Sequence, residues 1–137
     1  KRYIPVIASL GADSEGGILN VNADTVGGEI ARSVKASKYV SLTDVDGVYG
    51  ADKKLISTLT VAQAELEMAR GTISDGMVPK VRACLLAVQG GVHRAHILNG
   101  YTPGVLLAET FTQKGAGTMI LDTFEKDVYA RELGNAT

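Results

Sequence analysis

The sequence predicts an α/β fold: a mostly parallel open sheet with helices on both faces, as in an α/β/α sandwich. Short apolar runs alternate with segments in which apolar residues recur every three or four positions. Polar, glycine-bearing segments follow several of the apolar runs. Strands that alternate with helices of about 10 to 13 residues form mainly parallel sheets, because each helix crosses a face of the sheet.

The first two predicted elements lie on either side of a glycine-rich loop. Residues 3–10 form a short apolar run that ends at Gly11, which predicts a strand covered on both faces. A loop follows over 11–17, and β-like character resumes over 18–21. We therefore expect residues 3–10 to form the first strand of the sheet.

The next predicted element is an amphipathic helix that begins at Asn22. Its apolar residues recur at steps of three and four, namely Val26, Ile30, Ala31 and Val34. The side chain of Asn22 can cap the helix. The carboxylate of Asp24 lies in the first turn, where negative charge complements the helix dipole.

Further elements continue the alternation of strands and helices. A strand over 39–42 leads into a loop over 43–50. A second helix begins at Thr60, which forms a capping box with Gln63, and ends near Gly71. The remaining predicted elements are a third helix from 76–79 to 90–91, a strand over 94–98, a short helix over 105–110, a segment over 117–120 and a polar, helical, peripheral tail over 121–137.

Composition excludes several classes of protein. The 14 Lys and Arg residues nearly balance the 15 Asp and Glu residues, and a net charge of −1 argues against non-specific nucleic-acid binding. No apolar run approaches the roughly 18 to 20 residues of a membrane span. The single cysteine, Cys84, excludes an intrachain disulfide, so a reducing, cytoplasmic location is expected. Because Lys1 directly precedes an apolar run, we expect a piece of a longer protein.

Three segments lie where predicted strand ends meet helix starts, at 20–24, 43–49 and 74–80, and ligands collect there in such folds. Lys80 follows Pro79 in the first turn of its helix, where the dipole disfavours a cation. The position makes sense if the ammonium and free backbone N–H groups hold an anion. A lysine that bends into solvent explains the sequence equally well.

The other two segments have simpler explanations beside the functional one. Asn20, Asn22 and Asp24 alternate along an extended approach, so their side chains can converge on one ligand. Helix capping explains Asn22 and Asp24 without a ligand. Turn formation is the default explanation of 43–49, and nucleotide binding is the alternative.

Several apparent motifs fail on spacing. Residues 44–47 open like a calcium loop, but no glutamate closes it, and 114–118 carry phosphate-loop letters in the wrong order. Cys84 lies in an apolar helix and is expected to be a buried, inert thiol. Two histidines, His93 and His96, make a poor metal site, so we predict no metal held by protein ligands.

Three longer strings carry a family resemblance. They are Asn-Val-Asn-Ala-Asp at 20–24, Leu-Thr-Asp-Val-Asp-Gly-Val at 42–48, and Gly-Thr-Ile-Ser-Asp-Gly-Met-Val-Pro-Lys-Val at 71–81; weaker similarity at 90–92 and 115–120 extends the match. In this order and spacing the chain resembles the amino-acid kinase superfamily, specifically its acetylglutamate kinases. The resemblance implies the carboxy-terminal half of such an enzyme, with a nucleotide-binding domain over 1–120 and a peripheral tail over 121–137.

The resemblance also implies a reaction, in which ATP with its Mg²⁺ phosphorylates the side-chain carboxylate of N-acetyl-L-glutamate in arginine biosynthesis. Lys80 would stabilise the transferring phosphoryl group and Asp24 would orient the catalytic lysines. Asn20 and Asn22 would bind the substrate. The implied nucleotide-binding residues are Thr43, Asp44, Val45, Asp46, Gly47, Val48, Tyr49, Thr72, Ile73, Ser74, Gly76 and Met77.

The family's glycine-rich loop and second catalytic lysine have no counterpart in this sequence, so the isolated chain is expected to be inactive. Residues 109–118 resemble the carboxy-terminal signature of arginine-inhibited members, which implies an arginine effector and a homo-oligomer at full length. Two alternatives stay open: a sister kinase acting on N-acetylaminoadipate or glutamate, and a non-catalytic nucleotide-binding module.

Overall fold

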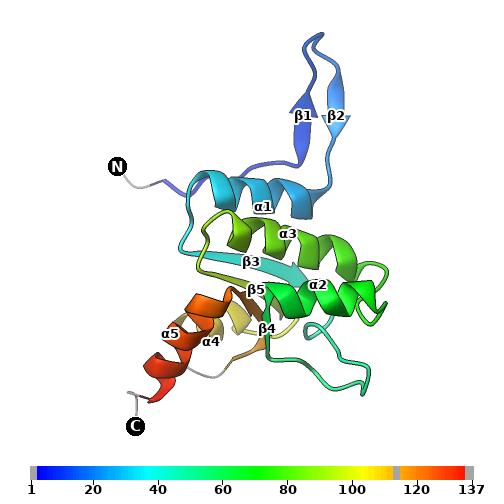
Figure 1. The fold of residues 1–137 in the computed structure, drawn as a ribbon. Coiled ribbons are helices and arrows are strands. Elements are labelled where there is room, and N and C mark those ends of the chain that lie inside the picture. Colours follow the sequence, from blue (N-terminus) through cyan, green and yellow to red (C-terminus); the bar gives the residue numbers. More distant parts are fainter. Residues whose placement is uncertain (1–2, 113–114, 135–137) are drawn as a thin grey trace.

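A computed structural model describes residues 3–112 and 115–134 (Figure 1). Along the chain the elements are β1 (Leu10–Ala12), β2 (Ile18–Asn20), α1 (Ala23–Ser33), β3 (Lys38–Thr43), β4 (Thr58–Thr60), α2 (Val61–Ala69), α3 (Met77–Gln89), β5 (Arg94–Asn99), α4 (Val105–Phe111), β6 (Gly117–Leu121) and α5 (Thr123–Gly134). None of the helices in these described ranges is long and apolar enough to cross a membrane.

The central sheet has four strands in the order β3-β5-β6-β4. The pairs β3–β5 and β4–β6 are parallel, while β5–β6 is antiparallel. The prediction of a mostly parallel open sheet is therefore confirmed. The strand β4 was missed, because three residues are too few for a periodic signal and Thr60 was assigned only to the cap of α2.

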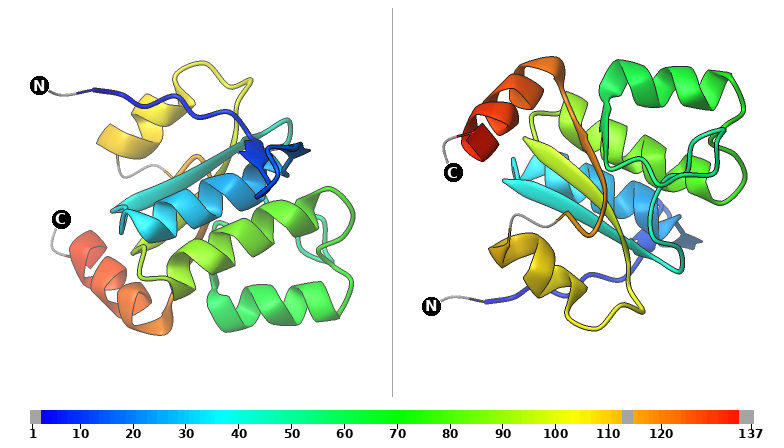
Figure 2. Two further views of the ribbon diagram at one scale, coloured as in Figure 1. Left: turned by 90° about the horizontal axis from the view of Figure 1, so that it is seen from above. Right: turned by 90° about the horizontal axis from the view of Figure 1, so that it is seen from below.

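Helices cover both faces of this sheet, as predicted. Figure 1 shows α1 and α3 side by side above β3, and Figure 2 shows α4 on the other side of that strand. The helix α2 packs against α3 and β4. A Cβ atom at Gly28 of α1 would lie 2.8 Å from the backbone oxygen of Ala83 in α3. The absence of a side chain at Gly28 therefore lets the two helices approach closely.

The helix caps predicted at the starts of α1 and α2 are both confirmed. Asn22 accepts a hydrogen bond from the backbone N–H of Thr25 at the start of α1. Thr60 and Gln63 form the reciprocal capping box at the start of α2.

The core beneath the helices is aliphatic, and its fully buried residues include Ile97, Leu98, Ile120, Leu121 and Val81.

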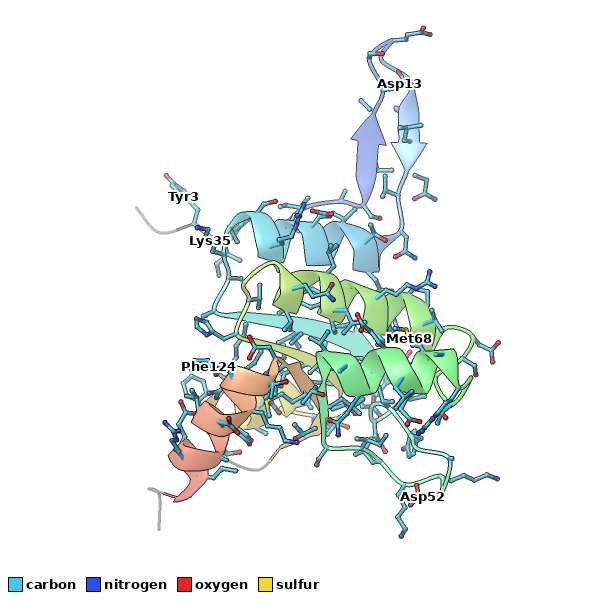
Figure 3. The ribbon with its side chains drawn as sticks, viewed as in Figure 1. Tyr3, Asp13, Lys35, Asp52, Met68 and Phe124 are labelled. Carbon is cyan, nitrogen blue, oxygen red and sulfur yellow. The ribbon has the colours of Figure 1, made fainter. Side chains whose placement is uncertain are left out.

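The predicted buried strand over 3–10 is wrong. Tyr3, Ile4 and Val6 are 79%, 92% and 95% exposed, and Leu10 alone enters a strand, β1. The strands β1 and β2 form a separate hairpin that projects from the body of the molecule, with Asp13 near its tip and Tyr3 pointing outward (Figure 3). The local sequence suits a strand, but burial also requires neighbouring strands and covering helices, which a local pattern does not supply.

A buried hydroxyl fixes the long connection between β3 and β4 to the sheet. Thr118 of β6 is fully buried, and its Oγ1 accepts a hydrogen bond from the backbone N–H of Val48 at 2.8 Å. The same hydroxyl donates to the carbonyl oxygen of Ile56 at 2.7 Å. Gly47 makes this approach possible, because a Cβ there would collide with the Thr118 hydroxyl.

We predict that Thr118→Val lowers the free energy of unfolding by about 1–3 kcal/mol, because one buried and one partly buried backbone group lose their partner while the volume is kept. Urea denaturation of the variant measures this change. The exposed Thr102 provides the matched control, Thr102→Val, which should unfold like the wild type. Equal stability of Thr118→Val and the wild type would contradict the role of this hydroxyl.

Candidate active site

The pairing of α1 with α3 brings together two charged side chains that are 56 positions apart in the sequence. Nζ of Lys80 donates to both carboxylate oxygens of Asp24, at 3.3 Å to Oδ1 and 3.2 Å to Oδ2. The two side chains are only 23% and 20% exposed, respectively. Lys80 therefore does not bend into bulk solvent, and it forms an ion pair at the start of both helices.

Further donors surround the carboxyl group and backbone of Asp24. Oγ of Ser41 in β3 donates to Oδ1 of Asp24 at 3.3 Å, and the hydroxyl of Tyr39 donates to the backbone oxygen of Asp24 at 3.4 Å. Burial raises the pKa of Tyr39 to about 12, with smaller contributions from Cys84 and Asp24. Burial also raises the pKa of the Cys84 thiol to about 12, helped by Asp24. Both groups are neutral near pH 7, and the predicted burial of the Cys84 thiol is confirmed.

A cavity of about 560 Å³ opens beside Lys80. Two segments from the predicted sites form its wall, one after β3 and one before α3. Its lining residues are Thr43, Asp44, Val45, Gly47, Val48, Tyr49, Thr72, Ile73, Ser74, Gly76, Met77 and Lys80. Every residue predicted to bind nucleotide is among them except Asp46.

The amino-terminal end of α3 faces this cavity. Gly76 is the N-cap residue, no side chain in the described part of the protein caps the helix, and both Gly76 and Met77 line the wall. The positive end of the helix dipole and the Lys80 ammonium thus lie at one hollow. This combination favours an anionic ligand. One carboxylate on the wall, Asp44, accepts a hydrogen bond from the hydroxyl of Thr43 at 3.1 Å.

Asp46 does not line the cavity, but its carboxylate binds two other side chains. Its Oδ1 accepts a hydrogen bond from Nδ2 of Asn99 at 2.8 Å, and its Oδ2 accepts one from the Tyr49 hydroxyl at 3.3 Å. The side chain therefore connects the loop after β3 to the end of β5. Sequence spacing gave no indication of this connection.

The two predicted substrate-binding asparagines lie outside the cavity lining. Asn20 is exposed at the end of β2, and Asn22 uses its side-chain oxygen to cap α1. Both precede Asp24 on the path from the hairpin into α1. Their role toward a substrate stays a prediction.

Residues 1–99 match the family model described as "Amino acid kinase family". This match covers well over half of the sequence. The chain belongs to the amino acid kinase family. It is 52% identical over 122 residues to an acetylglutamate kinase of Halothermothrix orenii, a match that covers 87% of this chain and 42% of the relative.

A second relative is the acetylglutamate kinase of Methanococcus maripaludis strain C7, at 46% identity over 124 residues, covering 88% of this chain and 42% of that protein. The predicted resemblance is confirmed. This amino acid kinase chain spans about two fifths of the length of the curated relatives that it matches.

Solved structures share the fold of this amino acid kinase chain. An N-acetylglutamate synthase from Neisseria gonorrhoeae, complexed with coenzyme A and L-arginine, matches with a TM-score of 0.78 at 33% identity, over 84% of this chain and 27% of that chain. A carbamate kinase from Giardia lamblia bound to AMP-PNP matches with a TM-score of 0.65 at 19% identity, over 82% of this chain and 37% of that chain. The second likeness bears on the fold alone.

A second hollow in this amino acid kinase lies near α4 and α5, and the sequence did not indicate it. Nδ1 of the buried His96 lies 2.8 Å from Oε1 of Glu109, while Nε2 of His96 has no partner among the described residues. Burial acts to raise the pKa of Glu109, but the hydrogen bond and charge of His96 prevail and lower it. The cavity of about 140 Å³ is lined by Lys38, Arg94, His96, Glu109, Thr110, Thr112, Gly115, Met119, Tyr129, Glu132 and Leu133.

The helix α5 is fixed to the start of β5 by Arg94. The guanidinium of Arg94 donates to Glu125 and to Glu132, each at 2.8 Å, and lies 5.0 Å from the ring centroid of Tyr129. The predicted helical character of the tail is confirmed over Thr123–Gly134, while its assignment as a separate peripheral unit stays a prediction. Of the arginine-type signature over 109–118, residues 113–114 lie outside the described part.

Proposed function

We propose that this chain is the nucleotide-binding part of an acetylglutamate kinase, which transfers the γ-phosphoryl group of ATP to the side-chain carboxylate of N-acetyl-L-glutamate. The observation that carries the proposal is the Lys80–Asp24 ion pair at the amino-terminal end of α3, beside a cavity. The similarity to acetylglutamate kinases over most of this chain supports the choice of acceptor.

The first cavity suits a nucleotide in size and in the character of its wall. Ligand pockets hold roughly 300–1,000 Å³, and this cavity has about 560 Å³. The polyphosphate would lie toward Gly76 and Lys80, where positive charge gathers, and the base and ribose would lie along the loop after β3. The Mg²⁺ ion would enter with ATP and add positive charge to the phosphates.

Phosphoryl transfer needs positioned reactants and positive charge more than it needs a base. The acceptor carboxylate, with an ordinary pKa of about 4.3, is already ionised at neutral pH. One of its oxygens would bond to the γ-phosphorus while the bond to the β–γ bridging oxygen breaks and ADP leaves. The Lys80 ammonium would stabilise the negative charge on the transferring group, and Asp24 would hold that ammonium in place.

Asn20 and Asn22 are proposed to contact the acceptor as it approaches Asp24 from the side of the hairpin. Their exposed position leaves them accessible to a ligand.

The second candidate role is an arginine effector site in the hollow near α5. Its acidic residues Glu109 and Glu132 suit a guanidinium or ammonium group, and its basic residues Lys38 and Arg94 suit a carboxylate.

In a complete enzyme that carries this chain, we predict that Lys80→Ala lowers kcat by about two to three orders of magnitude, by analogy with the loss of one oxyanion donor. A coupled ADP assay measures turnover, with N-acetylaminoadipate and glutamate as comparison acceptors. The exposed Lys126 of α5 gives the matched control, Lys126→Ala, which should keep wild-type turnover. Near-normal turnover of Lys80→Ala would contradict the proposed role of Lys80 in stabilising the transferring phosphoryl group.

The isolated chain should bind a non-hydrolysable ATP analogue with Mg²⁺ but produce no acyl phosphate. Calorimetry measures the binding, and hydroxamate trapping measures the acyl phosphate. Acyl-phosphate production by the isolated chain would contradict the need for a further catalytic part. Absence of binding would contradict the assignment of the cavity, whereas binding by a complete enzyme without turnover would favour a non-catalytic module.

Arginine should inhibit the complete enzyme, and Glu109→Gln should weaken that inhibition by about tenfold or more, because a carboxylate partner for the cation is lost. The inhibition constant for arginine checks this expectation, and thermal unfolding shows whether the variant stays folded. The exposed Glu15 supplies the control Glu15→Gln. An unchanged inhibition constant for Glu109→Gln would place arginine elsewhere.

A further inference from the structure

Ser41 occupies an unusual position for a hydroxyl. It lies in the middle of β3, where it is paired in register with Ile97 of β5, and it is only 5% exposed. Strand residues two apart share a face, and both Ser41 and Tyr39 contact Asp24 of α1. Ser41 therefore faces the helix layer, where an apolar side chain would ordinarily pack.

A buried hydroxyl lowers stability unless it finds a hydrogen-bond partner. Ser41 donates to Oδ1 of Asp24 at 3.3 Å, and it also interacts with the hydroxyl of the neighbouring Tyr39. Hydrogen bonds to a charged group are stronger than those between neutral groups. The sheet thus uses a core-facing strand position to contact the carboxylate that holds Lys80.

The hydrogen bonds around Asp24 show how this contact can restrain its carboxylate. Oδ1 of Asp24 accepts hydrogen bonds from both Ser41 and Lys80, whereas among the described residues Oδ2 accepts one from Lys80 only. A carboxylate held only by a long, flexible lysine can rotate about its side-chain bonds. Ser41, on a paired strand, removes that freedom and so fixes where the ammonium lies.

We propose that Ser41 is a positioning residue that orients Asp24 and, through it, the Lys80 ammonium toward the transferring phosphoryl group. The inference rests on the proposed kinase function. It predicts that loss of the hydroxyl affects the chemical step much more than nucleotide binding, because Ser41 does not line the cavity.

The test is Ser41→Ala in a complete enzyme that carries this chain. We expect kcat to fall about tenfold, the size of one lost hydrogen bond to a charged group, while KM for ATP changes by less than about twofold. The exposed Ser33 of α1 supplies the control, Ser33→Ala, which should match the wild type. If Ser41→Ala is destabilised, Ser41→Cys keeps nearly the same volume with a weaker donor and should also lower kcat.

A double-mutant cycle separates positioning from a general structural role. In an Asp24→Ala background, Ser41→Ala should cause no further loss of kcat, because the group through which it acts is gone. A further tenfold loss in that background, or wild-type kcat in Ser41→Ala, would overturn the inference. Full activity of Asp24→Ala and Lys80→Ala would instead refute the proposed function, so the two failures are distinguishable.

Discussion

The close packing of α1 against α3 is the constraint on which the rest of the site depends. Gly28 allows it, because any side chain at this position would meet the backbone of Ala83. The first turns of the two helices then lie together, and Asp24 and Lys80 come within hydrogen-bond distance. A wider separation of the helices would break this ion pair between two partly buried charges, which costs more than a surface ion pair contributes.

The side chains around the Lys80–Asp24 ion pair are neutral. Tyr39 and Cys84 keep their protons because burial raises the pKa of both groups, and Ser41 adds a neutral donor. The ion pair thus lies between an aliphatic core and an open cavity. Lys80 is thus held by Asp24 on one side and lines the cavity on the other.

Local sequence signals predicted those parts of the molecule that are determined locally. The caps at Asn22 and Thr60 depend on neighbours within three residues, and both predictions hold. The cavity wall was also anticipated, because strand ends and helix starts meet at one edge of an α/β sheet. The failed or missing predictions concern long-range partners: the exposed run over 3–10, the pair His96–Glu109 and the contact of Ser41 with Asp24. No spacing within a sequence encodes which distant residue will lie opposite.

The alternation of side chains along β6 has a practical consequence for anyone who wishes to alter this protein. Thr118 turns toward the loop that walls the first cavity, while its neighbour Met119 lines the second. The loop of the first cavity and the lining of the second thus each involve one of two neighbouring residues of β6. Changes in β6 made to reshape the second cavity therefore act next to the residue that holds the loop of the first, so independent redesign has to begin from α5 or from the segment that leads into α3.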